Sequence, residues 1–162
     1  MMDDDLFMIR KPEACVIRQA TAEDAAAVEA LYRELISDPL IHVSRSHVGK
    51  LFLSDTSFLL VAELDGIVRG TALLNLCQDA MYRAQPFGVV ENVVVSEKAR
   101  GHGIGRQLLT HVEHLAITRD CTKLMLLSSA TRTSAHAFFR RCGFTGDTKL
   151  GFVKYRSRFG IR

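Results

Sequence analysis

The chain has 162 residues, of which 48% are hydrophobic and 24% charged, and this balance is typical of one folded globular domain rather than a disordered or collagen-like chain. Its 21 basic and 18 acidic residues give a net charge of +3, too small to indicate a nucleic-acid-binding protein. No apolar run approaches the roughly 18 residues of a membrane span, and the start "MMDDDLFMIR" is acidic where a secretory signal is basic. We therefore expect a cytoplasmic protein that binds neither nucleic acid nor membrane.

The N-terminal half predicts a strand, two helices and a hairpin. Residues 1–14 lack periodicity and are expected to form a flexible arm before a domain over residues 15–162, which begins with the short strand "CVIRQA". Thr21 and Asp24 resemble a capping box, and the apolar spacing after them predicts a helix that stops before Asp38 and Pro39. A second helix is expected over about 44–53. The run "FLLVAELDGIVRGTALLNLC" predicts a hairpin that turns at its Asp-Gly pair.

The C-terminal half predicts a strand-helix-strand unit and a last helix. Residues 78–88 contain a proline and a glycine and are expected to form a loop, of the kind that often lines a binding site. "VVENVVV" and "KLMLLSS" read as buried strands joined by a helix with an apolar stripe from Leu108 to Ala116. "TRTSAHAFFRRCGF" predicts a helix capped by Ser134 and ended by Gly143, with extended pieces after it. Antiparallel and parallel neighbours together make a mixed sheet.

Histidine and cysteine patterns do not predict a metal site. The four cysteines are scattered and no two have the two-residue spacing of zinc or redox motifs. His111 and His114 lie three residues apart on the helix after the glycines, but a third ligand is not evident and their helix face lies opposite the apolar stripe. We therefore expect solvent-exposed histidines, reduced thiols and no metal.

Three glycines stand between a strand and a helix in "VVVSEKARGHGIGRQLL". A dinucleotide fingerprint requires a small residue where the chain has Arg106, and the Gly-Lys-Ser/Thr of a P-loop is absent. The turn nevertheless precedes a helix N-terminus, where unpaired N–H groups and the helix dipole favour an anion. Glycine permits the backbone angles with which consecutive N–H groups converge on phosphate oxygens. The sequence therefore predicts a diphosphate site, and a turn that uses glycine only for packing is the alternative.

These residues resemble the acetyl-coenzyme A motif of the GNAT-type N-acetyltransferases. The family signature Arg/Gln-x-x-Gly-x-Gly/Ala is matched by Arg100, Gly103 and Gly105, and the later "AHAFFRRCGF" is similar to the family's helix-plus-Gly-Phe motif. The resemblance covers nearly the whole chain from Cys15 onward. It implies a single-domain α/β acetyltransferase fold with a mixed, mostly antiparallel sheet, a central βαβ unit, splayed strands and about four helices.

The resemblance implies that acetyl-coenzyme A (acetyl-CoA) is bound through backbone groups and a few side chains. Strand residues pair with the pantetheine arm, and the glycine turn holds the diphosphate. Arg132 stands where relatives have an asparagine that contacts the cofactor, so it reaches either a cofactor phosphate or an acidic group of the substrate, or it is a surface arginine. The predicted cofactor residues are Val93, Val94, Val95, Arg100, Gly101, His102, Gly103, Ile104, Gly105, Arg106, Arg132 and Phe139.

The resemblance also implies direct attack of a primary amine on the thioester, with catalytic roles for Glu91 and Asn92. An amine with a pKa near 10.4 must lose a proton before it attacks, and Glu91 lies where similar proteins often carry a basic carboxylate. A structural or substrate-binding Glu91 stays open as the alternative. A backbone N–H group near Asn92 or Val93 polarises the acetyl carbonyl.

Phe139 is a second position that departs from the family pattern. Many relatives use a tyrosine hydroxyl as the acid that protonates the departing thiolate, where this chain has Phe139. Either Tyr82, Cys142 or water replaces that acid, or no acid is needed. The last alternative is open because a thiol with a pKa of about 8.5 leaves as thiolate at a cost of about 2 kcal/mol. A sensor or assembly subunit that binds coenzyme A without efficient catalysis is the alternative function. We expect a small-molecule amine as acceptor; its identity and a homodimeric state stay open.

Overall fold

The computed structural model describes residues 15–160, so the predicted arm at residues 1–14 lies outside the described part of the chain. Backbone contacts divide the described residues into two compact units, 15–125 and 126–160. Each unit is described by itself. The first holds most of the sheet and three helices, and the second holds the last helix and the C-terminal segment.

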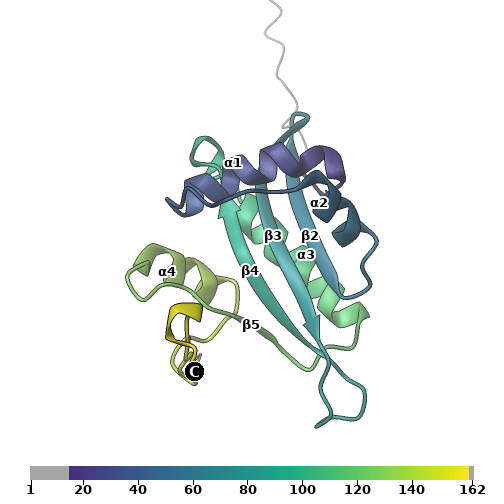
Figure 1. Ribbon diagram of the computed structural model, residues 1–162, viewed down its shortest axis with the longest axis vertical. Coiled ribbons are helices and arrows are strands. Elements are labelled where there is room, and N and C mark those ends of the chain that lie inside the picture. The colour runs from purple at the N-terminus through teal and green to yellow at the C-terminus, as the bar shows by residue number, and fades with distance from the viewer. Residues whose placement is uncertain (1–14, 161–162) are drawn as a thin grey trace, which may run out of the picture. The chain divides into compact units, whose positions relative to one another are not determined.

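The sheet has five strands in the order β1-β2-β3-β4-β5 (Figure 1). Neighbours from β1 to β4 are antiparallel. At the last position, Thr122 N donates to Pro86 O over 2.9 Å and Gly88 N donates to Lys123 O over 2.9 Å. Because the residue numbers increase in the same direction along both paired segments, this pairing is parallel. The predicted mixed sheet is therefore confirmed. The strands are β1 Val16–Gln19, β2 Ser57–Leu64, β3 Ile67–Cys77, β4 Phe87–Val95 and β5 Leu124–Leu126.

Four α-helices accompany the sheet within residues 15–160, in agreement with the predicted number. In the first unit, α1 and α2 cover one face and α3 the other (Figure 1). Their bounds are α1 Ala25–Leu35, α2 Arg45–Phe52, α3 Ile104–Thr118 and, in the second unit, α4 Thr133–Arg141. Short 3₁₀ helices lie at η1 Ala22–Asp24, η2 Glu97–Ala99 and η3 Arg156–Arg158.

Alternating side chains of the central strands build a core on each face of the sheet. Leu59 and Val61 point to the face of α1 and α2, where they join Val28 and Val48 in one buried cluster. On the opposite face, a Cβ atom at Gly70 would lie 3.1 Å from Leu108 of α3, so that helix packs closely on β3. This period of two along the strands and the apolar stripe of each helix are the patterns that the sequence shows.

The hairpin between β2 and β3 turns at Asp65 and Gly66, as predicted. Both residues have positive φ, 57° and 72°, which is the geometry of a type I′ turn and matches the twist of the flanking strands. A Cβ atom at Gly66 would meet nothing within 4 Å. Glycine is therefore required there by its backbone angle and not by packing.

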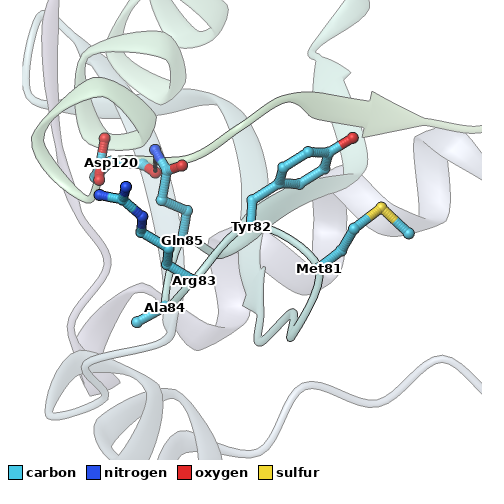
Figure 2. Close-up of a pocket in the computed structure, with 6 residues that line it drawn as sticks. All are labelled: Met81, Tyr82, Arg83, Ala84, Gln85 and Asp120. Carbon is cyan, nitrogen blue, oxygen red and sulfur yellow. Dashed lines mark hydrogen bonds between the residues drawn. The ribbon is translucent and has the colours of Figure 1, made fainter.

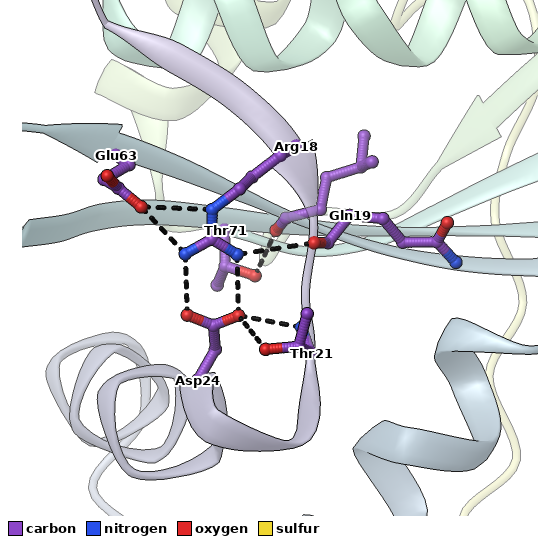
Figure 3. A network of polar contacts seen from close by, with 7 residues as sticks. Arg18, Gln19, Thr21, Asp24, Glu63 and Thr71 are labelled. Atoms are coloured by element: carbon purple, nitrogen blue, oxygen red, sulfur yellow. Dashed lines mark hydrogen bonds and ion pairs between the residues drawn. The ribbon is translucent and has the colours of Figure 1, made fainter. Parts of the chain in front are cut away.

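Arg18 ties β1 to β2 and to the start of the first helix (Figure 3). Its guanidinium donates two hydrogen bonds to Asp24, of 2.8 and 2.9 Å, and two to Glu63, of 3.0 and 2.8 Å. Asp24 also accepts from Thr21 N over 2.8 Å and from Thr21 Oγ1 over 3.3 Å, and the predicted capping box is present. The Arg18 hydrogen bonds hold the pKa of the buried Asp24 carboxyl below its usual value.

Replacing Asp24 with asparagine is expected to lower the free energy of unfolding by about 2 kcal/mol, because the Arg18 guanidinium then loses a charged partner. The Arg18 side chain is 34% exposed, so water compensates for part of this loss. Since the folded-state pKa of Asp24 is depressed, the contribution is complete above the unfolded-state pKa of about 3.9 and is lost as pH falls below it. Urea unfolding at pH 7 and pH 3 measures both effects. Glu23→Gln, which removes an exposed ion pair with Arg45, is the control and should cost at most about 1 kcal/mol; equal losses in the two variants would contradict the prediction.

Several details of the prediction are wrong. Gly88 belongs to β4 and not to the loop before it. A Cβ atom at Gly88 would lie 2.6 Å from Leu124, so the close approach of the two strands requires glycine at this position. β5 has only three residues, and its Met125 is 41% exposed, so it is not a buried strand. His111 is half-buried rather than exposed, and burial lowers its pKa.

The second unit also differs from the prediction. Ser134 lies inside α4, whose N-cap is Arg132, whereas Gly143 has a φ of 90° and follows the helix end as expected. Up to Gly160, the C-terminal segment after α4 contains no strand, so the extended pieces predicted around Phe144 and Phe152 are not β-structure. Apolar runs this short depend on partners elsewhere in the chain for strand formation.

Candidate functional site

The turn between β4 and α3 is built from glycines in a left-handed conformation. Gly101 has a φ of 81° and Gly103, the N-cap of α3, a φ of 76°. A Cβ atom at either position would meet no atom within 4 Å. These two glycines are therefore required by the backbone path, and close packing does not explain them.

Six consecutive N–H groups at this turn have no acceptor in the described part of the chain. None of the backbone nitrogens of residues 101–106 donates a hydrogen bond, and the first bond of the helix runs from Gln107 N to Gly103 O over 3.1 Å. A helix leaves four such groups unpaired, and the left-handed glycines extend the row by two. This is the donor array that a diphosphate requires.

The side chains around the turn have distinct positions. Arg100 Nε donates to Val95 O over 3.2 Å and its guanidinium lies 3.7 Å from Glu97, so Arg100 is folded back towards the end of β4 with its charge exposed. His102 Nδ1 lies 3.0 Å from Arg100 O. Arg106 is exposed, whereas Ile104 is 2% exposed, so Ile104 offers only backbone groups to a ligand.

A β-bulge lies in β4 at Asn92. Leu73 pairs with Glu91 and Thr71 with Val94, so three steps along β4 correspond to two along β3. Asn92 has a φ of 54°, a conformation that Asn accepts more readily than other non-glycine residues. The extra residue puts Glu91 and Val94 on one face of the sheet, that of α1, because their partners on β3 share that face. The bulge therefore changes the direction of the backbone between Glu91, the predicted base, and Val93 to Val95, the strand residues predicted to bind the cofactor.

The last turn of α1 holds β4 at two points that the sequence does not reveal. Tyr32 is half-buried, and burial raises the pKa of its phenol while the Asn92 side chain lowers it. Glu34 accepts from Ser96 Oγ over 3.1 Å and from Glu97 N over 2.9 Å. About sixty residues separate the partners, so no local signal could have found these contacts.

Arg132 and Phe139 belong to the second unit. Arg132 is exposed at the start of α4. Phe139 is half-buried, with its ring centroid 5.3 Å from that of Phe138 and 6.2 Å from that of Phe144. His136 Nε2 lies 2.9 Å from Ser129 O. Packing within this unit thus accounts for the predicted aromatic pair, and a role of these residues in cofactor binding stays a prediction.

Comparison with known families agrees with the geometry of the turn. The sequence profile of the acetyltransferase (GNAT) family matches residues 26–144, a stretch that contains α1 except its first residue, the bulge, the glycine turn and α4. The chain belongs to this family. It is an acetyl-CoA-dependent N-acetyltransferase, and acetyl-CoA is its acetyl donor.

Similar proteins include two named acetyltransferases. The chain is 36% identical to the aminoglycoside N(6')-acetyltransferase type 1 of Stenotrophomonas maltophilia, with 87% of this chain and 93% of that protein aligned. It is 30% identical to the aminoalkylphosphonate N-acetyltransferase of Salmonella typhimurium, over 86% of this chain and 93% of that protein. The solved structure of a putative acetyltransferase from Agrobacterium tumefaciens has a TM-score of 0.79 at 30% identity and covers 87% of this chain and 99% of its own. These similarities confirm the predicted family and fold.

A pocket of about 610 Å³ lies in this acetyltransferase at the connection between β3 and β4 (Figure 2). Arg83, Gln85 and Asp120 gather on one side of it and Tyr82 on the other, and Gln85 Nε2 donates to Asp120 O over 3.4 Å. The predicted loop therefore lines a pocket, and Tyr82, one of the candidates for the acid, is part of the lining. Glu91, Asn92 and the predicted cofactor residues are not among the lining residues. The lining residues are Met81, Tyr82, Arg83, Ala84, Gln85 and Asp120.

Residues 15–160 were found to contain neither a helix that could span a membrane nor a group of metal ligands. None of the helices described there is long and apolar enough to cross a membrane. No three or more His, Cys, Asp or Glu side chains in that range are grouped so that they could hold a metal ion.

Proposed function

We propose that this N-acetyltransferase acetylates a primary amine of a small molecule, with an aminoglycoside as the first candidate. The relative that acts on aminoglycosides by name is 36% identical along almost its full length. An aminoglycoside carries several ammonium groups, and Glu91 provides a carboxylate on the α1 face of the sheet beside the bulge. A carboxylate both attracts a cationic acceptor and takes the proton that the amine must lose.

An aminoalkylphosphonate is the second candidate. The relative named for it is 30% identical, and such a molecule pairs an amine with an anionic group.

An acceptor panel tests both candidates. Purified protein is mixed with acetyl-CoA and release of the coenzyme A thiol is followed with an aminoglycoside that bears a 6′-amine, with aminomethylphosphonate and with free lysine. Turnover with the first and not with the other two supports the aminoglycoside. Turnover with the phosphonate alone supports the second candidate, and an absence of turnover with both would overturn the proposed acceptor class.

In the proposed site, each group acts from a fixed backbone. The N–H groups of residues 101–106 hold the diphosphate, with Arg100 and Arg106 adding charge at its edges. Val93, Val94 and Val95, in the last part of β4, pair with the pantetheine arm. Acetyl-CoA supplies an activated thioester when bound. Glu91 accepts the amine proton, and N–H groups at the bulge donate to the acetyl carbonyl oxygen.

We propose that the enzyme works in the cytoplasm and forms a homodimer. Support for the homodimer comes from large apolar side chains that are exposed in the second unit, of which Phe152 is 91% exposed, since such patches are typical of association surfaces. The others are Leu150, Val153, Tyr155 and Phe159.

A further inference from the structure

Residues 96–100 connect β4 to the glycine turn, and two buried residues fix the path of this connection. Ser96 is 6% exposed and Ala99 is 4% exposed, whereas the two residues between them are exposed. Ser96 N donates to Arg69 O of β3 over 2.8 Å, and Ala99 N donates to Ser96 O over 2.8 Å. The path of the whole connection therefore depends on where Ser96 lies.

The carboxylate of Glu34, in the last turn of α1, holds the start of this connection. One oxygen accepts from Ser96 Oγ over 3.1 Å, and the other accepts from Glu97 N over 2.9 Å. Ser96 is the N-cap residue of η2 but provides no cap with its own side chain, because its hydroxyl donates to Glu34. A residue of α1 thus supplies the acceptor that a capping side chain usually supplies.

The short helix η2 leads directly into the glycine turn. His102 Nδ1 lies 3.2 Å from Ala99 O and 3.0 Å from Arg100 O, so this ring bridges the end of η2 and the turn. The row of unpaired N–H groups begins at the next backbone position, Gly101. A shift of the start of η2 therefore changes the direction in which the N–H groups point.

We propose that Glu34 is a positioning residue for the cofactor: by holding Ser96 and Glu97, it directs the N–H groups of residues 101–106 towards the diphosphate. The proposal rests on the proposed function of the glycine turn. Glu34 touches no reacting atom in this account. Without its two hydrogen bonds, the start of η2 samples other positions, and only the fraction of molecules in which the N–H groups are aligned binds the cofactor.

Glu34→Met tests the proposal, since methionine keeps the length and the helix propensity of the side chain and removes both acceptors. The calorimetric Kd for coenzyme A should rise about fivefold, which corresponds to the loss of a helix cap. The kcat at saturating acetyl-CoA should change less than about twofold. Loss of a negative charge by itself favours an anionic ligand, so a higher Kd reports lost positioning. An unchanged Kd would overturn the proposal.

The conservative variant Glu34→Gln separates hydrogen bonding from charge. Its amide oxygen can accept from Glu97 N while its NH₂ group donates to Ser96 Oγ, so both contacts persist without the charge. The Kd for coenzyme A should therefore stay within about twofold of the original value. A Kd that rises as much in Glu34→Gln as in Glu34→Met would overturn the role of the hydrogen bonds.

Glu29→Met is the matched control for general destabilisation. Glu29 lies on the same helix and also accepts from a backbone N–H group, that of Val43, over 2.9 Å, but Val43 lies in the connection between α1 and α2. Urea unfolding should show at least as large a loss of stability as in Glu34→Met, and calorimetry should show an unchanged Kd for coenzyme A. Equal losses of affinity in the two methionine variants would contradict a specific role of Glu34.

A donor without a diphosphate shows whether the effect passes through the glycine turn. S-acetylpantetheine has the thioester and the pantetheine arm but no diphosphate. Its kcat/KM should be the same in Glu34→Met and in the unmodified protein, whereas kcat/KM for acetyl-CoA should fall about fivefold. An equal fall with both donors would overturn the proposal, because the effect would then not depend on the diphosphate.

Failure of the proposed function is distinguishable from failure of this inference. Calorimetry with coenzyme A needs no acceptor, so it tests Glu34 even if the proposed acceptor class is wrong. If the double variant Gly101→Ala and Gly103→Ala keeps its affinity, the diphosphate site is wrong and the role of Glu34 is overturned with it. If the double variant loses affinity and Glu34→Met does not, only the role of Glu34 is overturned.

Discussion

Replacing both Gly101 and Gly103 with alanine is expected to weaken acetyl-CoA binding about 100-fold. Alanine at their φ angles of 81° and 76° is strained by about 1–2 kcal/mol at each position, so the turn relaxes to other angles and its N–H groups no longer converge. Loss of two charge-assisted hydrogen bonds, worth about 1.5–3 kcal/mol each, accounts for the factor. Calorimetric titration with acetyl-CoA measures it.

Gly66→Ala is the matched control for this prediction. Gly66 has nearly the same angle, 72°, and the same open space around its Cβ position, but it lies in the hairpin turn between β2 and β3. The control should lose a similar amount of stability per substitution and none of its affinity. Affinity that survives in the double variant would mean that the turn does not hold the diphosphate.

Replacing Glu91 with glutamine is expected to lower kcat by 10² to 10³. General-base catalysis contributes about 10² to 10⁴, and glutamine keeps the size of the side chain while it cannot accept the proton of the amine. Affinity for acetyl-CoA should be unchanged, since the diphosphate turn is untouched. Steady-state kinetics with the best acceptor of the panel, together with calorimetry, separates the two quantities.

The Glu91 prediction has a matched control and an outcome that would contradict it. Glu113→Gln removes an exposed carboxylate from the surface of α3 and should leave kcat within twofold. If Glu91→Gln raises the KM for the acceptor and leaves kcat unchanged, Glu91 binds the substrate and is not the base. The alternative of a substrate-binding Glu91 would then replace the proposed mechanism.

The sequence predicts most of the first unit because its signals are local. The Asp65-Gly66 turn, the capping box at Thr21 and the apolar stripe of α3 each depend on residues within a few positions of one another. The assignment of Gly88 to a loop was wrong because glycine and proline usually mark loops. The requirement for that glycine comes from Leu124 on a neighbouring strand, which lies far away in the sequence.

The candidate site divides in the same way. The glycine turn is a continuous motif, so its residues could be named in advance. The bulge at Asn92 could not, because a bulge is a mismatch of register between two strands and only the pairing with β3 shows it. Glu34 was missed since nothing in α1 itself indicates that it holds the end of β4. In the second unit, the strand prediction was wrong because short apolar runs require partners that their own sequence does not specify.

The six unpaired N–H groups of the glycine turn also determine how the enzyme behaves in solution. Exposed donors of this kind are hydrated when no ligand is bound, and any small oxyanion competes with that water for the same place. Phosphate or sulfate buffer should therefore raise the apparent KM for acetyl-CoA, whereas a buffer without such anions should not. The choice of buffer salt thus becomes part of every affinity measured for this protein.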